Sequence, residues 1–468
     1  MDHDHTGRLR NITLVLSDML LISLSTFISG WVYLGGGFGT VENPIAWFMT
    51  CSLSITFLYL YNLYADWKRK SIKRLLLSVS IAVIISYTVL LFLSMIYQSL
   101  LNGNGITLMT TLVIQLLLLN CSRSLYWYIG RRTRGKKRVL VLGANDKADY
   151  ETIFKLLNHS KGWFELNHYI PSYEKESFPY YLSQTDVIVL CPSLSRDEKS
   201  EIICTCSRRG IEIMIVPELE ELFIHQSSLQ QIDDMPVLSI NPLGLTSSQR
   251  LAKRVFDIMV ASVLLIISSP IILVLFFFIP ITSKGSALFK QERLGEGEKH
   301  YFLYKFRSMV NDAEKQTGPV LASDADPRVT NIGRFIRSTR LDELPQLINV
   351  LKGEMSLIGP RPEREYFINQ FKNEIPNYSY RMAIKPGLTG LAQILSNYST
   401  TVDNKLRFDL LYIRNYSFLL DMKILFQTVS VVLQREQAGG VKKFEKEIKE
   451  QVIASEGEQT NPKSLTQI

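Results

Sequence analysis

Long apolar stretches alternate with short charged connections along the N-terminal part of the chain. Four of these stretches cover about 11–34, 44–64, 75–97 and 106–128. Each can form a helix across the hydrocarbon core of a bilayer, which takes about 20 residues. The first stretch lacks a small-residue cleavage pattern, so we interpret it as an anchor rather than a signal peptide. The pattern predicts a four-helix transmembrane domain over residues 1–135.

Lysine and arginine residues gather on one side of the four predicted spans. The connections near 35–43 and 98–105 contain neither residue type. The other flanks hold Arg8, Arg10, Lys68, Arg69, Lys70, Lys73, Arg74, Arg131, Arg132, Arg134, Lys136, Lys137 and Arg138. Because cytoplasmic loops carry the excess of positive charge, both ends of this bundle are expected to face the cytoplasm.

The same distribution explains the net charge of +8. Residues 1–138 contain 14 Lys and Arg against 5 Asp and Glu, and the remainder contains 38 against 39. The excess therefore lies beside the apolar stretches, where it reports membrane orientation. A nucleic-acid partner would need a basic surface on a soluble domain, so we expect none.

One acidic residue, Asp18, falls inside the first apolar stretch. A carboxylate there is costly unless it is paired or hydrated. Arg123, near the cytoplasmic end of the fourth stretch, is the candidate partner. A structural ion pair is favoured, and a transport role is the alternative.

Residues 136–248 change to short β-branched runs separated by polar helical segments. The runs are Arg138–Leu142, Asp186–Cys191 and Ile211–Val216, with a helix predicted near Asp197–Arg209. This alternation is typical of an α/β domain with a parallel sheet. A dinucleotide site is the tempting interpretation, but the stretch Gly143–Ala148 supplies one glycine where the fingerprint needs three. A degenerate Rossmann-like domain for assembly or regulation is favoured.

A fifth apolar segment, Val255–Ile281, is long enough to cross a membrane. Lys253 and Arg254 precede it and Lys284 follows it, so both flanks favour the cytoplasm. Ser268-Ser269-Pro270 interrupts it; Pro270 lacks an N–H and clashes with the Ile266 carbonyl, while the serine hydroxyls can satisfy the freed backbone. A crossing would also place the basic C-terminal half on the outer side of the membrane. We expect a re-entrant helix-break-helix over residues 249–283.

The most informative stretch is Arg337–Pro362. It places Asp342 and Glu343 at the start of an amphipathic helix whose apolar positions are Leu344, Leu347, Ile348 and Leu351. A helix N-terminus can bind a phosphate and keeps a carboxylate ionised. Arg337 and Arg361 flank the pair and can clamp phosphate oxygens. The alternative is that the two acids only cap the helix.

Several ordered motifs carry a resemblance to a known family. They are Lys253-Arg254 with Asp257, Gln291-Glu292-Arg293 with Gly295, Tyr304–Met309, the stretch just described, and Lys385–Gln393. From about Lys253 to Leu433 the chain resembles the bacterial sugar transferases, which are polyprenyl-phosphate hexose-1-phosphate transferases with a monotopic catalytic domain. The larger members are similar in carrying four spans and a Rossmann-like module first. The expected fold class is thus a membrane helical bundle, an α/β domain, and an α+β phosphoglycosyl transferase domain with a re-entrant membrane helix.

The resemblance implies a reaction and a set of residues for residues 284–435. Asp342 would attack the sugar-bearing phosphate of a UDP-sugar and release UMP, and undecaprenyl (polyprenyl) phosphate would then take the phosphosugar. Such covalent catalysis splits one encounter of two anionic substrates into two displacements. Glu343 is a hard oxygen ligand suited to Mg²⁺, and Arg337 and Arg361 would stabilise the transferring phosphate. The product would start exopolysaccharide, capsule or O-antigen synthesis.

Four further residues are weaker candidates for substrate or phosphate binding. Lys305 and Arg307 lie on or beside a strand-like run, Tyr301–Phe306, and could cover the nucleotide or the lipid phosphate. Interfacial snorkelling is the alternative for either cation. Asp409 and Asp421 are carried over from the family pattern, and both could instead cap or pair locally. Asp257 is expected to bind the cationic flank of the re-entrant segment.

The resemblance also implies surroundings and partners. The chain is expected in a bacterial inner (cytoplasmic) membrane with its catalytic domain on the cytoplasmic face. Its expected partners are a UDP-hexose, polyprenyl phosphate and membrane lipid, with a homodimer as a further candidate. The sequence departs from the family pattern at Ser396-Asn397-Tyr398 and at Leu391, so the hexose is left open. Residues 436–468 alternate in charge and then turn polar, which predicts a solvated helix followed by disorder.

Two rival functions remain at this point. A membrane-anchored nucleotide-sugar dehydratase or epimerase would share four spans and a Rossmann unit, but it needs a complete glycine fingerprint and a longer domain. A non-catalytic scaffold for polysaccharide assembly would not need Asp342, Glu343, Arg337 and Arg361 together. Labelling of the protein by a UDP-sugar separates transfer from both rivals.

Overall fold

The computed structural model of the chain divides into two compact units, residues 1–217 and residues 218–468. The structure describes residues 2–33, 44–64, 71–96, 105–134, 136–143, 164–224, 227–283, 285–310, 326–396 and 400–434. Lys284, the stretch 144–163, the Asn397-Tyr398 part of the loop discussed above and the predicted tail 436–468 lie outside these ranges.

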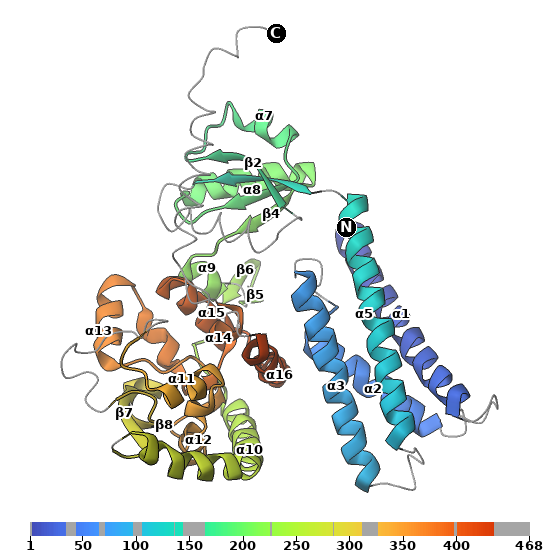
Figure 1. The fold of residues 1–468 in the computed structure, drawn as a ribbon. Coiled ribbons are helices and arrows are strands. Elements are labelled where there is room, and N and C mark those ends of the chain that lie inside the picture. The colour runs from blue at the N-terminus through green and yellow to red at the C-terminus, as the bar shows by residue number, and fades with distance from the viewer. Residues whose placement is uncertain are drawn as a thin grey trace. The chain divides into compact units, whose positions relative to one another are not determined.

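The first unit begins with four apolar helices, as predicted (Figure 1). They are α1 (Asp2–Tyr33), α2 (Pro44–Leu60), α3 (Ile72–Ile96) and α5 (Gly105–Arg134). Three of them are long and apolar enough to cross a membrane. α2 has 17 residues because the chain turns at Tyr61–Tyr64, where Asn62 has a positive φ of 54°. The apolar helices identify the N-terminal part as membrane-bound.

The predicted ion pair inside this bundle is confirmed. A guanidinium nitrogen of Arg123 lies 2.5 Å from Oδ2 of Asp18, and both side chains are fully buried. A second polar contact lies elsewhere in the bundle, where Tyr87 donates to Gln115 and Gln115 donates to Ser54. Such internal pairing is how polar groups are accommodated where lipid offers no partner.

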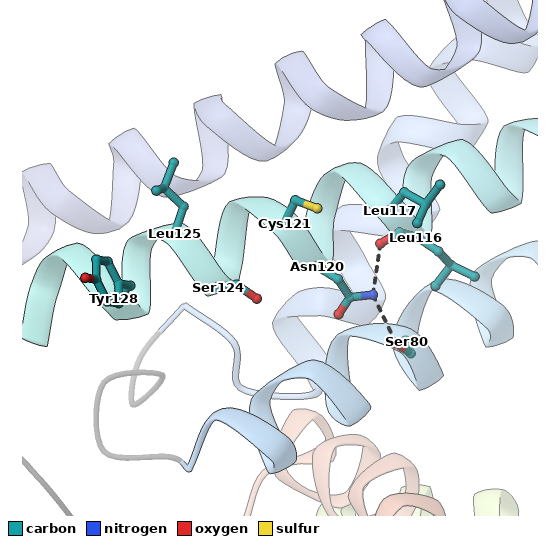
Figure 2. Close-up of a pocket in the computed structure, with 8 residues that line it drawn as sticks. All are labelled: Ser80, Leu116, Leu117, Asn120, Cys121, Ser124, Leu125 and Tyr128. Atoms are coloured by element: carbon teal, nitrogen blue, oxygen red, sulfur yellow. Dashed lines mark hydrogen bonds between the residues drawn. The ribbon is translucent and has the colours of Figure 1, made fainter.

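A groove of 570 Å³ lies between α3 and α5 (Figure 2). Asn120 donates to Ser80 at 3.1 Å and to the Leu116 carbonyl at 2.9 Å, so the amide joins the two helices. The groove is lined by Ser80, Leu116, Leu117, Asn120, Cys121, Ser124, Leu125 and Tyr128.

The α/β part of the first unit contains the predicted parallel sheet. Its strands are β1 (Lys137–Leu142), β2 (Phe164–Ile170), β3 (Val187–Leu190) and β4 (Glu212–Ile215), in the order β2-β1-β3-β4. Every pairing is parallel. The helices are α7 (Phe178–Ser183) and α8 (Arg196–Arg209), and a capping box of Ser195 and Glu198 begins α8. β2 is an addition to the predicted strands, and the Rossmann-like classification stays a prediction.

One glycine shows how the end of β1 is packed. Gly143 has a φ of 77°, and a Cβ there would lie only 2.4 Å from Cγ of Leu194. The buried side chain of Leu194 therefore leaves no room for a larger residue at position 143.

The second unit begins before the predicted catalytic part. α9 (Leu219–Ile224) and the antiparallel hairpin of β5 (Ser228–Ile232) and β6 (Met235–Ser239) belong to it. Arg414 ties this region to the rest of the unit by donating to the carbonyls of Asn241 and Phe223.

The predicted re-entrant segment is α10 (Ser247–Thr282), one helix of 36 residues that runs through Pro270 and Pro280. A straight helix of this length would extend about 54 Å. Figure 1 instead shows α10 bent into two arms, both against the second unit. Ser269 donates to the Ile266 carbonyl at 2.7 Å, which is the carbonyl that Pro270 leaves without its usual donor. The serine hydrogen bond predicted to compensate for Pro270 is therefore present, and α10 is bent but continuous.

Both arms of α10 pack on the same body. Phe256 and Ala261 join the main core, and Leu275 and Ile279 join a second cluster around Phe306. Asp257 was expected to bind the cationic flank: its hydrogen bonds come instead from Ser356 and from the Leu357 nitrogen, both at 3.1 Å, while Lys253 and Arg254 act on it only through their charge. Lys253 pairs with Asp421 instead, at 2.6 Å. Tertiary packing therefore gives Lys253 and Asp257 different hydrogen-bond partners.

The remaining elements form the body that carries the site. In chain order they are β7 (Leu288–Leu294), η3 (Glu296–Glu298), β8 (His300–Phe306), α11 (Asn331–Ser338), η4 (Leu341–Glu343), α12 (Gln346–Lys352), β9 (Ser356–Ile358), α13 (Glu365–Glu374), η5 (Tyr378–Ala383), β10 (Gly387–Thr389), α14 (Leu391–Leu395), α15 (Val402–Arg414) and α16 (Phe418–Gln434). β7 pairs antiparallel with β8, and β9 pairs parallel with β10. This mixture of hairpin and helices agrees with the predicted α+β arrangement.

Candidate active site

The acid pair lies in a short 3₁₀ turn between two helices. α11 ends at Ser338, Arg340 adopts a left-handed conformation with φ 59°, and η4 then carries Asp342 and Glu343. A positive φ is rare for a residue with a bulky side chain and typically marks a tight turn. The two acids were expected at or near the N-cap of the following helix; α12 begins at Gln346 after an N-cap at Pro345, so they lie in the turn immediately before it. Both acids are more than nine-tenths buried.

Glu343 is bound by three cations. Its Oε1 accepts from Lys305 Nζ at 3.2 Å and from Arg361 Nη2 at 3.0 Å, and its Oε2 lies 3.7 Å from Arg340 Nη1. Burial alone would raise the pKa of this carboxyl, but the three cations outweigh burial and hold the pKa well below its ordinary value. Glu343 is therefore ionised throughout the physiological range.

Asp342 differs from its neighbour. Among the residues that the structure describes, none donates a hydrogen bond to its carboxylate. Burial raises the pKa of Asp342, and the charge of Glu343 raises it further, against the opposing effect of Lys305, Arg337 and Arg361. A carboxylate that keeps its lone pairs free and has a raised pKa is a better nucleophile than one held in ion pairs.

The turn that carries Arg361 is fixed by close backbone packing. Gly359 donates its N–H to the Thr389 carbonyl at 2.8 Å, and Gly387 donates to the Pro360 carbonyl at 2.9 Å. A Cβ on Gly387 would lie 2.1 Å from the Gly359 nitrogen, so the two backbones touch without room for a side chain. The rigid turn predicted from the glycines and prolines is present, and it brings Arg361 to Glu343.

Lys305 and Arg307 diverge at the end of β8. Lys305 reaches Glu343, and burial lowers its pKa more than Glu343 raises it. Arg307 is turned to the end of α10, where it donates to the Ser283 carbonyl at 2.6 Å and to the Ser283 hydroxyl at 2.8 Å. The structure thus brings Lys305 to the acid pair, whereas Arg307 binds Ser283 at the end of α10.

Asp409 and Asp421 are both buried in ion pairs. Asp409 lies 2.8 Å from Arg381, and burial raises its pKa to about 6 in spite of that arginine. Asp421 accepts from Lys253 at 2.6 Å and from the Tyr412 hydroxyl at 2.7 Å. Neither carboxylate forms a hydrogen bond or ion pair with the residues that bind Glu343, so the role of Asp409 and Asp421 in substrate binding stays a prediction.

The charges at the acid pair do not cancel. Lys305, Arg337, Arg340 and Arg361 act on two carboxylates. An excess of cations around two buried carboxylates suits a ligand with several phosphate oxygens.

Mg²⁺ would need donors besides the side chains of the described residues. Within the described ranges no group of three or more His, Cys, Asp or Glu could hold a metal ion alone. Mg²⁺ commonly binds through one or two carboxylates together with substrate phosphates and water. Oε2 of Glu343, whose one cationic contact is the 3.7 Å approach of Arg340, fits that limited requirement.

Three residues at or near this site were not predicted. Arg340 lies two positions before Asp342, and this closeness in the sequence is the signal that could have identified it. Arg293 belongs to the Gln291-Glu292-Arg293 motif, but no role followed from the motif. Arg381 has no sequence signal, since its partners Asp409 and the Arg361 carbonyl meet it only through tertiary packing.

Comparison with known proteins shows the family to which the chain belongs. Residues 248–435 match the model of the family described as bacterial sugar transferase. A putative undecaprenyl-phosphate N-acetylgalactosaminyl 1-phosphate transferase of Bacillus subtilis (strain 168) is 55% identical over 130 residues, which are 28% of this chain and 72% of that protein. The chain belongs to the bacterial sugar transferase family.

Two longer relatives match over a larger part of the chain. A UDP-N-acetylgalactosamine-undecaprenyl-phosphate N-acetylgalactosaminephosphotransferase of Aeromonas hydrophila is 37% identical over 239 residues, 50% of this chain and 56% of that protein. A UDP-glucose:undecaprenyl-phosphate glucose-1-phosphate transferase of Klebsiella pneumoniae is 40% identical over 230 residues, 48% of each chain. The chain therefore spans about half the length of these curated relatives. Their names specify different sugars.

Proposed function

We propose that the chain is a polyprenyl-phosphate sugar-1-phosphate transferase, which moves hexose 1-phosphate from a UDP-sugar to undecaprenyl phosphate. The observation that carries the proposal is the contrast within the acid pair. Glu343 is bound by Lys305 and Arg361, whereas the carboxylate of Asp342 accepts no hydrogen bond from any described residue. The relatives named above are undecaprenyl-phosphate sugar phosphotransferases, which supports the same reaction class.

The first displacement would take place at the sugar-bearing phosphorus. A carboxylate oxygen of Asp342 forms a bond to this phosphorus, the phosphoanhydride bond to the other phosphate breaks, and UMP leaves with the electron pair. The acyl phosphosugar stays on the protein. Because the nucleophile is an ionised carboxylate, the step needs no proton transfer to activate it.

In the second displacement an oxygen of undecaprenyl phosphate attacks the same phosphorus, and the bond to Asp342 breaks. A phosphoanhydride is again present in the product, so the exchange is nearly balanced and Asp342 is restored. Two displacements let a water-soluble donor and a lipid acceptor use one site in turn rather than together.

The cations would stabilise the charge on the transferring phosphate. Arg361 presents a planar fork from a rigid turn, and Lys305 presents an ammonium from the end of β8. Each is expected to stabilise the transition state by a few kcal/mol, roughly 3. Mg²⁺, when bound at Glu343 together with the nucleotide phosphates, would supply further charge neutralisation there.

The bent helix α10 would hold this chemistry at the membrane surface. Its middle exposes Ile266, Ile267 and Leu273, whereas its two ends are tied to the same body by Lys253 and by Ser283. A re-entrant helix of this form enters and leaves on the cytoplasmic face, as the positive flanks favour. The setting is then the inner membrane of a bacterium, with the site facing the cytoplasmic supply of UDP-sugars.

The product would be the first lipid-linked sugar of a surface polysaccharide, such as exopolysaccharide, capsule or O-antigen. The relatives differ in the sugar their names specify. The hexose should therefore be found with a panel of UDP-sugars.

The proposal is tested with the full-length chain in membranes or detergent. A panel of UDP-sugars labelled in the sugar is incubated without lipid acceptor, and covalent label and UMP are measured. We expect label on the wild type with one or a few sugars, and none on Asp342→Asn. Adding undecaprenyl phosphate should move the label to lipid. A normal adduct in the Asp342→Asn variant would remove the nucleophile assignment, and failure of every sugar would favour a scaffold.

A further inference from the structure

We propose that Arg381 and Arg293 are positioning residues that together hold the Arg361 turn in register with the acid pair; this inference rests on the proposed transferase function. The two arginines come from different elements, η5 and β7 respectively. They grip consecutive backbone carbonyls of the same turn.

Arg381 holds the carbonyl of Arg361 itself. Its Nη2 donates to that oxygen at 2.9 Å and lies 2.8 Å from Oδ2 of Asp409, while its Nη1 donates to the Tyr378 hydroxyl at 2.5 Å. Arg381, Tyr378 and Asp409 are all more than nine-tenths buried. The guanidinium is therefore fixed by an acid and a phenol before it reaches the turn.

Arg293 holds the next carbonyl along the chain. Its Nη1 donates to the Pro362 oxygen at 3.2 Å and lies 3.8 Å from Glu363, and its Nη2 donates to Gln291 at 2.6 Å. Its side chain is 14% exposed. Burying a guanidinium is costly unless its hydrogen bonds are made, so the backbone of this turn is among the bonds that compensate for the burial.

The two contacts restrict the one residue whose aim matters for the site. Arg361 projects from a turn whose other side is fixed by the contact of Gly359 with Gly387. Its guanidinium then meets Glu343 at 3.0 Å. A planar fork on a short turn can serve phosphate oxygens only when the backbone beneath it cannot rotate, and a shift of about 1 Å is enough to cost roughly 100-fold in rate. Hydrogen bonds to the carbonyls of Arg361 and Pro362, one before and one after the proline, restrict that freedom.

Lysine cannot replace either arginine in this task. Arg381 uses two nitrogens of one rigid plane to meet three partners, and an ammonium on a flexible stem cannot reproduce that geometry. Arg381→Lys therefore keeps the positive charge and removes the grip. Arg414→Lys is the matched control, because Arg414 also donates to two backbone carbonyls, of Asn241 and Phe223, without touching the site.

The test is a double-mutant cycle between Arg381→Lys and Arg361→Ala in the full-length chain, with kcat and KM for UMP release from the preferred UDP-sugar. If Arg381 acts through Arg361, Arg381→Lys lowers kcat about tenfold in the wild-type background and less than about twofold when Arg361 is already alanine. We expect the loss mainly in kcat, with the melting temperature close to that of the control Arg414→Lys. Arg293→Lys is expected to behave in the same way.

Each outcome decides the proposal. Equal losses in both backgrounds, or full activity of Arg381→Lys and Arg293→Lys, would overturn it. If Arg381→Lys fails to fold, Asp409→Asn takes its place in the cycle, since it keeps the side-chain size and releases the guanidinium of Arg381. A wild type that releases UMP and labels Asp342 while the cycle is additive refutes the positioning role alone. A wild type inactive with every sugar refutes the transferase, and the positioning role falls with it.

Discussion

Arg361 donates a hydrogen bond of 3.0 Å to Glu343, which precedes it by 18 positions. The same carboxylate oxygen accepts from Lys305. The two neighbouring acids therefore differ in their hydrogen bonding. Glu343 accepts hydrogen bonds from two cations, whereas Asp342 accepts none from the described residues. A pair that looks symmetrical in the sequence becomes, in three dimensions, one charge-holding residue and one candidate nucleophile.

This contrast predicts how the acid side of the pH profile responds to Glu343→Gln. Burial raises the pKa of Asp342 and the charge of Glu343 raises it further. Attack needs the ionised carboxylate, so adduct formation falls as the pH is lowered through that raised pKa. Removing the negative neighbour, and freeing Lys305 and Arg361 to act on Asp342, lowers the pKa. The acid limb should move to lower pH, measured as the rate of adduct formation in a single turnover.

The matched control for this prediction is Glu363→Gln. Glu363 acts on Arg361 and lies near Arg293, but it is not among the groups that shift Asp342. The acid limb of the pH profile of Glu363→Gln should lie at the same pH as that of the wild type. An unmoved limb in Glu343→Gln, or one shifted to higher pH, would contradict the assignment of the two acids.

A second prediction concerns the divalent cation. Chelation with EDTA should stop UMP release, and Mg²⁺ should restore it. Glu343→Gln should raise the Mg²⁺ concentration for half-maximal activity about tenfold, equivalent to about 1.4 kcal/mol of lost binding. The measurement is a Mg²⁺ titration at saturating UDP-sugar. Activity that survives chelation, or an unchanged titration in the variant, would contradict a role for Glu343 in holding the metal.

Much of the arrangement around the acid pair could be predicted because its residues lie in short, recognisable sequence motifs. Asp342, Glu343 and Arg361 stand in one stretch with turn-forming glycines and prolines, and Lys305 stands at the end of an alternating strand. Asp18 and Arg123 were predictable for another reason: a charge in hydrocarbon needs a partner at its own depth. In each case one physical requirement limits the arrangement strongly.

The rest could not be predicted because it depends on contacts between distant segments. Lys253 meets Asp421 across 168 positions, and no periodicity expresses that pairing. Arg307 carries a guanidinium that suits a phosphate, but in the structure this group donates to Ser283 at the end of α10. The acid pair lies in η4, a separate turn before α12, which follows the left-handed conformation of Arg340, and the helical periodicity of the sequence does not predict that turn.

A third prediction concerns the bend in α10. Ser269 donates to the Ile266 carbonyl, the acceptor that Pro270 leaves unused, whereas Ser268 donates to the Leu264 carbonyl at 2.6 Å. Ser269→Ala removes the compensating bond in an apolar setting and should lower the free energy of unfolding by about 1 kcal/mol. Ser268→Ala is the matched control and should have the smaller effect. Thermal unfolding in detergent measures both, and equal effects would contradict the special role of Ser269.

Pro270→Leu extends the same argument to topology. Without the proline, the 36 residues of α10 favour a straight helix of about 54 Å, which is long enough to cross the bilayer. We expect part of the population to carry its C-terminal half on the outer side, and activity to fall accordingly. Labelling of an introduced C-terminal cysteine by an impermeant reagent in intact cells measures this. Labelling of the wild type to the same extent would contradict the cytoplasmic placement of the catalytic part.

The last prediction concerns the buried pair of Asp18 and Arg123 in the membrane bundle. Asp18→Asn leaves the guanidinium buried without its counter-charge, which should destabilise the bundle by about 3 kcal/mol. The double substitution Asp18→Leu with Arg123→Leu removes both charges and should recover most of the loss, because an apolar pair needs no desolvation of ions. Glu201→Gln breaks an exposed pair with Lys175 and should change stability by less than about 1 kcal/mol. Melting temperatures in detergent give all three values. If the double variant melts as low as Asp18→Asn, the pair contributes net stability rather than mutual compensation, and the bundle depends on the two charges for more than neutrality.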